Sequence, residues 1–160
     1  MTGTRFERFE TVLKQQARAM RAKDLMQREV VTVRADVPLS ELADMLQQAH
    51  IHGAPVVGDD GVLVGFVSQE DVLFGNMTGP PDPPEGDRDT PSTDEFVARV
   101  GDIMTAPAVT ATEETDVRDL CRLMWRLRLH HIPIVRDDKV MGIVSSLDLC
   151  RVIADGGVED

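Results

Sequence analysis

The sequence contains few cysteines, and its hydrophobic residues form no long uninterrupted run. Cys121 and Cys150 are too few for a disulfide framework and form no paired CxxC metal site, so they indicate buried thiols in a reducing compartment. No uncharged stretch approaches the roughly 20 residues that span a bilayer. The charged N-terminus also lacks the apolar core of a signal peptide. We therefore expect a cytoplasmic protein with no membrane partner.

Positive charge is also scarce, with 17 basic against 28 acidic residues and a formal net charge of −11. An acidic protein is repelled by nucleic-acid backbones and by anionic membrane surfaces, which argues against both as main partners. Much of the excess lies in residues 80–95, where six acidic residues accompany one arginine. Apolar residues make up 42% and charged residues 28% of the 160 positions, which is typical of a soluble, folded protein.

The sequence contains an internal repeat. Asp24-Leu25-Met26 and Asp102-Ile103-Met104 are 78 positions apart, as are Pro55 and Pro133. Further along, Gly65-Phe66-Val67-Ser68 and Gly142-Ile143-Val144-Ser145 are 77 apart, so one residue has been lost in a turn, where a change of length costs little.

Each copy changes its hydrophobic period in the same order, from a short strand to an amphipathic helix, a hairpin and a second helix. The first copy predicts strands at 30–33, 54–57 and 62–67, a helix that opens within 36–40 and has its apolar positions at Leu39, Leu42, Ala43, Leu46 and Ala49, and another helix from Ser68. The second copy predicts strands at 108–111, 132–135 and 140–144, a helix over 116–129 and another from Ser145. The expected fold class is α/β (α+β), with a small sheet and two helices in each copy. Because each copy alone has a small core, we expect the two to pack sheet against sheet around a pseudo-two-fold axis, leaving clefts between them.

The predicted organisation has five segments. They are an N-terminal amphipathic helix (1–21), the first repeat (22–75), an acidic, proline-rich linker (76–98), the second repeat (99–154) and a C-terminal tail (155–160).

The order D-h-M, h-T, amphipathic helix, H-x-x-P-h-h and G-h-h-S-x-x-D, where h is hydrophobic, resembles the CBS domain, named for cystathionine β-synthase. Its tandem pair is called a Bateman module, and the resemblance covers residues 22–75 and 99–154. It implies a regulatory module that binds AMP, ADP, ATP or a related adenosyl compound between the repeats. It also implies no required cofactor and no catalysis, and the regulated partner stays unidentified.

The S-x-x-D motif has two interpretations. Ser68 with Asp71, and Ser145 with Asp148, form the pattern of a capping box at a helix start. The same helix start presents free N–H groups that suit a phosphate, and its carboxylate can accept hydrogen bonds from a ribose diol. Gly65 and Gly142, which lack a Cβ, would let a ligand approach the strand closely. The family resemblance implies these ligand roles, with the aspartate on the ribose and the serine near the phosphate.

The remaining candidate residues lie in the pre-proline loops and the first strands. All four histidines fall in the two matching loops, where imidazole could contact a phosphate, although the prolines there are explained by an extended entry to a strand. Thr32 and Thr110 match the strand that lines the adenine in the family, yet they are equally residues of an ordinary strand. The full set of predicted ligand residues is Thr32, Val33, Ala54, Pro55, Ser68, Asp71, Thr110, Ile132, Pro133, Ser145 and Asp148, with phosphate contacts from His52, His130 and His131.

Three other hypotheses compete with nucleotide sensing. The module could mediate protein assembly with empty clefts. It could sense metal or redox state through its histidines and cysteines, although their spacing matches no metal-ligand pattern. Catalysis lacks a nucleophile and base positioned by a third group.

Trp125 lies beside the predicted buried stripe of its helix, which consists of Val117, Leu120, Cys121, Met124 and Leu127. The tryptophan therefore either caps the core or contacts a second subunit, and we expect a homodimer.

Overall fold

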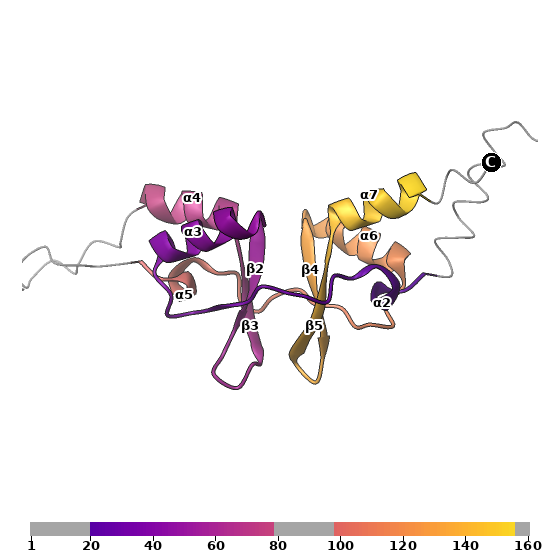
Figure 1. Ribbon diagram of the computed structural model, residues 1–160, viewed down its shortest axis with the longest axis horizontal. Coiled ribbons are helices and arrows are strands. Elements are labelled where there is room, and N and C mark those ends of the chain that lie inside the picture. The colour runs from indigo at the N-terminus through magenta and orange to yellow at the C-terminus, as the bar shows by residue number, and fades with distance from the viewer. Residues whose placement is uncertain (1–19, 79–97, 156–160) are drawn as a thin grey trace, which may run out of the picture. The chain divides into compact units, whose positions relative to one another are not determined.

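The computed structural model describes residues 20–78 and 98–155 and shows a mixed α/β fold with two sheets. The described chain divides into two compact units (Figure 1). The β2–β3 unit consists of residues 31–78 and 98–108, and the β4–β5 unit consists of residues 20–30 and 109–155. The N-terminal helix, most of the linker and most of the C-terminal tail predicted from the sequence lie outside the described residues.

The β2–β3 unit is built on a three-stranded sheet in the order β1-β2-β3. Strand β1 is parallel to β2, and β2 and β3 form an antiparallel hairpin. Its elements are β1 (Val33–Arg34), α3 (Leu39–Ala49), β2 (Gly53–Val57), β3 (Leu63–Ser68), α4 (Gln69–Thr78) and α5 (Val100–Ile103).

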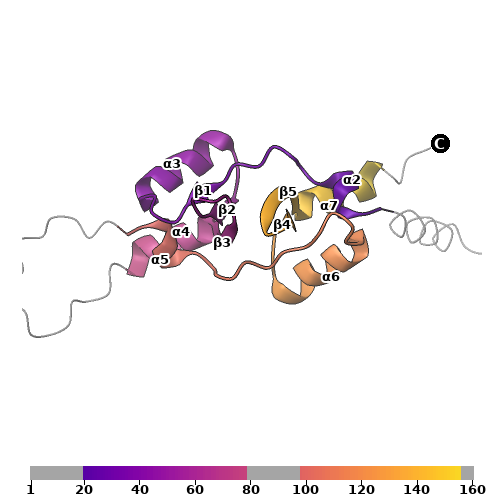
Figure 2. The same cartoon turned by 90° about the horizontal axis from the view of Figure 1, so that it is seen from below.

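The β4–β5 unit repeats this plan with a two-stranded antiparallel hairpin. A single bridge from Ala111 to Ile134 takes the place of the parallel third strand. Its elements are α2 (Ala22–Leu25), α6 (Val117–Leu127), β4 (His131–Arg136), β5 (Lys139–Ser145) and α7 (Ser146–Asp155). Figure 2 shows α5 beside α4 in one unit and α2 beside α7 in the other.

Each unit has its own hydrophobic core between the long helices and the hairpin. Leu42 in α3 and its counterpart Leu120 in α6 are fully buried, because both lie on the apolar stripe of their helix. The β2–β3 core consists of Val33, Leu39, Leu42, Leu46, Ala54, Val56, Val67, Val72 and Val100. The β4–β5 core consists of Ala22, Leu25, Met26, Ala111, Val117, Leu120, Met124, Ile132, Ile134, Val144 and Leu149.

The compact units and the sequence repeats do not coincide, because each unit contains the D-h-M segment of the other repeat. Gln27, from the start of the first repeat, exchanges two backbone hydrogen bonds of 2.9 Å with Ile143 in β5. Thr105 makes the equivalent pair with Phe66 in β3, at 2.9 and 3.0 Å. The chain therefore passes from one unit to the other at residues 30–31 and again at 108–109.

The residues of the D-h-M motif explain why each exchanged segment packs against the unit that contains it. Asp24 Oδ2 accepts a hydrogen bond from the Arg21 N–H at 2.8 Å, and Asp102 does the same for Arg99, so each aspartate closes the first turn of a four-residue helix. Met26 then packs in the core of the β4–β5 unit, where it is 7% exposed.

Ion pairs add to the docking of the 20–30 segment. Glu114 pairs with Arg21 and, at 2.7 Å, with Lys23. Hydrogen bonding from Lys23, and then from Arg21, lowers the pKa of the Glu114 carboxyl. Glu113 similarly pairs with Arg28, at 3.7 Å. The carboxylates that hold the first-repeat segment thus belong to the second repeat.

The sequence placed several residues wrongly. Strand β1 has only two residues, and the second copy keeps a single bridge there, because the chain turns almost at once toward α3 and α6. Cys121 and Cys150 are exposed rather than buried. Leu127 is 49% exposed, since the buried stripe of α6 runs along Val117, Leu120 and Met124 only.

Candidate functional site

The S-x-x-D motif of the β2–β3 unit forms a reciprocal cap at the start of α4. Asp71 Oδ2 accepts hydrogen bonds from the Ser68 N–H and from Ser68 Oγ, both at 2.7 Å. The Asp71 N–H in turn donates to Ser68 Oγ at 3.2 Å. The capping-box interpretation of the sequence is therefore confirmed for this motif, and it uses only one of the two carboxylate oxygens.

The motif of the β4–β5 unit repeats the same geometry at the start of α7. Asp148 Oδ2 accepts from the Ser145 N–H at 2.8 Å and from Ser145 Oγ at 2.7 Å, and the Asp148 N–H donates to Ser145 Oγ at 3.2 Å. In both units Oδ1 points away from the cap and is the oxygen left for other partners.

The two motifs differ at Oδ1. Asp148 Oδ1 accepts a hydrogen bond from Gln27 Nε2 at 3.2 Å and lies 3.9 Å from an Arg151 guanidinium nitrogen. Asp71 Oδ1 accepts no hydrogen bond from the described residues of its own unit. Asp148 is 4% exposed, whereas Asp71 is half-buried. Neither Gln27 nor Arg151 was predicted from the sequence.

The helix starts hold fewer free N–H groups than the sequence suggested. Besides the capping bonds, the Gln69 N–H donates to the carbonyl of His52, and the Ser146 N–H donates to the carbonyl of His130, both at 2.9 Å. The pre-proline loops are thus tied to the helix starts through their backbones. A phosphate binding there would have to rely on side chains more than on the helix N–H groups.

The other predicted ligand residues divide into buried and exposed groups. Buried side chains are those of Val33, Ala54, Pro55, Ile132 and Pro133, and Val33, Ala54 and Ile132 pack in the cores. Exposed side chains are those of Thr32, Thr110, His52 and His130, while His131 is half-buried.

The glycines of the G-h-h-S motif have a packing role that the sequence did not reveal. A Cβ built on Gly142 would lie 2.6 Å from Met26 Sδ and 2.9 Å from the Gln27 carbonyl oxygen. On Gly65 it would lie 2.7 Å from Met104 Sδ and 2.9 Å from the Thr105 oxygen. We expected these glycines to let a ligand approach the strand, but the exchanged segment of the chain fills that space.

Comparison with known families decides the identity of this architecture. The sequence profile described as "CBS domain" matches residues 22–75 and 100–155. The chain belongs to the CBS domain family. The resemblance seen in the sequence is confirmed, as is the α/β fold class.

Among curated relatives of this CBS pair, the "Uncharacterized protein MJ1225" of Methanocaldococcus jannaschii is 21% identical over 131 residues. That alignment covers 82% of this chain but only 42% of the relative, so the chain spans less than half of that protein's length.

Two solved structures share the fold. The CBS domain pair of protein MJ0100, in complex with 5′-methylthioadenosine and S-adenosyl-L-methionine, has a TM-score of 0.70 at 23% identity, over 85% of this chain and 97% of that one. CBSX2 in complex with AMP has a TM-score of 0.68 at 22% identity, over 86% and 98% of the two chains.

Two other features are absent from the described part of this CBS pair. Within residues 20–78 and 98–155, no group of three or more histidine, cysteine, aspartate or glutamate side chains is arranged to hold a metal ion. Within the same ranges, none of the helices combines the length and the apolar character needed to cross a bilayer.

Proposed function

We propose that this CBS pair is a regulatory module that binds an adenine nucleotide or a related adenosyl compound at its S-x-x-D motifs and changes conformation in response. The observation that carries the proposal is the pair of capping aspartates. Each keeps Oδ2 on its serine and leaves Oδ1 out of the cap, and a carboxylate oxygen is a strong acceptor for ribose hydroxyls.

The similar CBS pairs support the class of ligand. One of the solved structures holds AMP, and another holds 5′-methylthioadenosine and S-adenosyl-L-methionine. All three compounds share adenosine with a modified 5′ position. The expected adenine contacts at Thr32, Val33, Ala54, Pro55, Thr110, Ile132 and Pro133, and the expected phosphate contacts at His52, His130 and His131, stay part of the proposal. So do the location of the ligand between the repeats, the absence of catalysis and the cytoplasmic location.

Isothermal titration calorimetry tests the proposal with AMP, ADP, ATP and S-adenosylmethionine. Asp71→Ala and Asp148→Ala are each expected to remove one site. Glu70→Ala is the matched control, because this exposed carboxylate lies in the same helical turn as Asp71 without capping it. Unchanged stoichiometry in the double alanine variant would reject the assignment of the sites.

If none of the four compounds produces heat or a shift in the melting midpoint, the module does not sense adenosine. The competing assembly function would then be favoured. Its support on the structure is the exposure of apolar side chains on α6 and α7, where Trp125 is 73% and Leu147 is 72% exposed.

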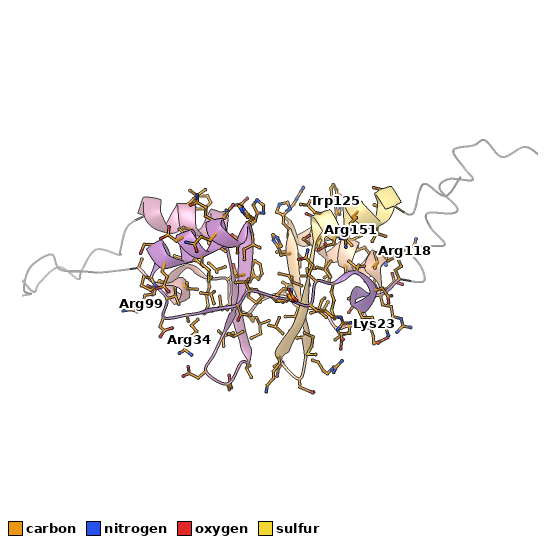
Figure 3. The ribbon with its side chains drawn as sticks, in the orientation of Figure 1. Lys23, Arg34, Arg99, Arg118, Trp125 and Arg151 are labelled. Carbon is orange, nitrogen blue, oxygen red and sulfur yellow. The ribbon has the colours of Figure 1, made fainter. Side chains whose placement is uncertain are left out.

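The same surface supports the homodimer that the sequence predicted. The Arg128 Cζ lies 5.1 Å from the centroid of the Trp125 ring. The Trp125 side chain, labelled in Figure 3, stays open to solvent. The alternative that Trp125 caps the core of its own unit is not supported. Light scattering at micromolar concentration should give a dimer mass, and Trp125→Gln, which copies its counterpart Gln47 in the first repeat, should weaken the dimer. A monomer mass for the unaltered protein would contradict the dimer.

A further inference from the structure

We propose that Gln27 makes the two adenosine sites unequal, so that the site at Asp71 fills first and the site at Asp148 is held partly closed by the protein's own amide. This inference rests on the proposed function and adds to it a residue that sets the affinity of one site.

The inference starts from the atoms around Asp148. Gln27 Nε2 donates to Oδ1 at 3.2 Å, which is the oxygen that the cap leaves for a ribose hydroxyl. A carboxylate oxygen can accept two hydrogen bonds, so the amide competes with the ribose without excluding it. Arg151, 3.9 Å from the same oxygen, further satisfies the charge of Asp148. A ligand at this site must therefore replace or share interactions that the folded protein already has.

The position of the Gln27 side chain follows from the exchanged segment. Its backbone is fixed against β5 by the two hydrogen bonds with Ile143, and the capping residue of α7, Ser145, follows two residues after Ile143. The side chain then extends from a rigid backbone to Asp148, although the two residues are 121 positions apart in the sequence.

The other unit provides an internal comparison. The counterpart of Gln27, at the repeat distance of 78, is Thr105, whose backbone pairs with Phe66 in the same way. Among the described residues, Thr105 donates no side-chain hydrogen bond to Asp71, since threonine is shorter than glutamine by two heavy atoms along the chain. Position 74, the counterpart of Arg151, is a phenylalanine and brings no positive charge. Asp71 therefore keeps Oδ1 available within its unit and is the more exposed of the two aspartates.

The expected size of the effect follows from the strength of one hydrogen bond to a charged group. When a ribose hydroxyl displaces the Gln27 amide from Asp148, the new hydrogen bond recovers only part of the free energy of the old one. The affinity for the ligand is therefore lower by about tenfold. The Asp148 site should thus bind AMP about tenfold more weakly than it would without Gln27.

Single-site variants allow each site to be titrated alone with AMP. Asp148→Asn isolates the Asp71 site, and Asp71→Asn isolates the Asp148 site. Asparagine keeps an oxygen that can accept the serine N–H, so the helix cap is retained while the negative charge is removed. We expect the Asp71 site to be the tighter one.

The decisive test exchanges the two counterpart residues. In the Asp71→Asn background, Gln27→Thr should tighten the Asp148 site about tenfold. In the Asp148→Asn background, Thr105→Gln should weaken the Asp71 site, because the backbone at 105 is placed as it is at 27. Equal melting midpoints and circular dichroism spectra of the variants confirm that folding is intact, and Gln27→Ala provides a second variant if Gln27→Thr folds poorly.

The outcomes separate this inference from the proposed function. If AMP binds both isolated sites with equal affinity and the exchange variants change nothing, the role of Gln27 is wrong while nucleotide binding stands. If AMP, ADP, ATP and S-adenosylmethionine all fail to bind the unaltered protein, the proposed function is wrong and this inference falls with it.

Discussion

Replacing Gly142 by alanine should loosen the docking of the exchanged segment in the β4–β5 unit. The new Cβ would lie 2.6 Å from Met26 Sδ and 2.9 Å from the Gln27 carbonyl oxygen, both far inside normal contact distance. The sulfur can shift a little, but the carbonyl is fixed because it accepts the Ile143 N–H at 2.9 Å. Strain of this kind costs about 1–3 kcal/mol.

An opposing effect reduces that cost. Alanine restricts the unfolded chain more than glycine does, which stabilises the folded protein by about 0.4–1 kcal/mol where no strain arises. The net loss should therefore be about 1–2 kcal/mol in the free energy of unfolding. For a chain of this length, that corresponds to a fall of about 2–8 °C in the melting midpoint.

Calorimetry and amide hydrogen exchange measure the effect. Gly142→Ala should lower the melting midpoint and speed exchange at Gln27 and Ile143, while the bridge between Phe66 and Thr105 in the other unit serves as an internal reference. Gly58→Ala is the matched control, since its Cβ would first meet only the side chain of Asp60, at 3.1 Å. A melting midpoint at or above that of the unaltered protein would refute the packing role of Gly142.

Three further predictions concern stability and reactivity. Leu120→Ala should destabilise the protein by about 2–5 kcal/mol in chemical denaturation, because the side chain is fully buried, whereas Leu147→Ala, at a position 72% exposed, should change little. The hydrogen bond from Lys23 lowers the pKa of Glu114 in the folded state, so the Glu114 carboxylate stabilises the fold above pH ~4.3 and loses this effect as the pH falls through the lowered pKa. Glu114→Gln should therefore be less stable than the unaltered protein above pH ~4.3 and equally stable in acid. A stability difference that persists in acid would contradict this. Although Cys121 is exposed as a residue, neighbouring atoms partly desolvate its thiol, and this desolvation raises the thiol pKa. Its alkylation by iodoacetamide should therefore reach half its maximal rate above pH ~8.5, and a midpoint below that value would show that the thiol is fully solvated.

The local structure of each repeat could be predicted well from the sequence. Helix α3 (Leu39–Ala49) covers the apolar positions from which a helix was predicted, and the capping pair Ser68–Asp71 forms as its spacing indicates. These features depend on residues within a few positions of each other, so the periodicity and the capping pattern contain the necessary information. The hairpins were also predicted to within one or two residues.

The exchange of the D-h-M segments could not be predicted, because it pairs residues more than 100 positions apart in one unit. A signal was nevertheless present in Gly142 and Gly65, since a glycine inside a strand often marks the close approach of another backbone. From the sequence alone, that approach was predicted to be a ligand's. Only the structure shows that Met26 and Met104 occupy the space.

The exchange also changes how divergence between the repeats acts on function. In a simple tandem pair, a substitution in one repeat would alter the site of that repeat. Here position 27 belongs to the first repeat, yet its side chain reaches Asp148 in the second. The chain passes from the β4–β5 unit to the β2–β3 unit between Val30 and Val31. A ligand that displaced Gln27 from Asp148 would therefore act on a residue only four positions before Val31. The two proposed sites are thus linked by the covalent chain.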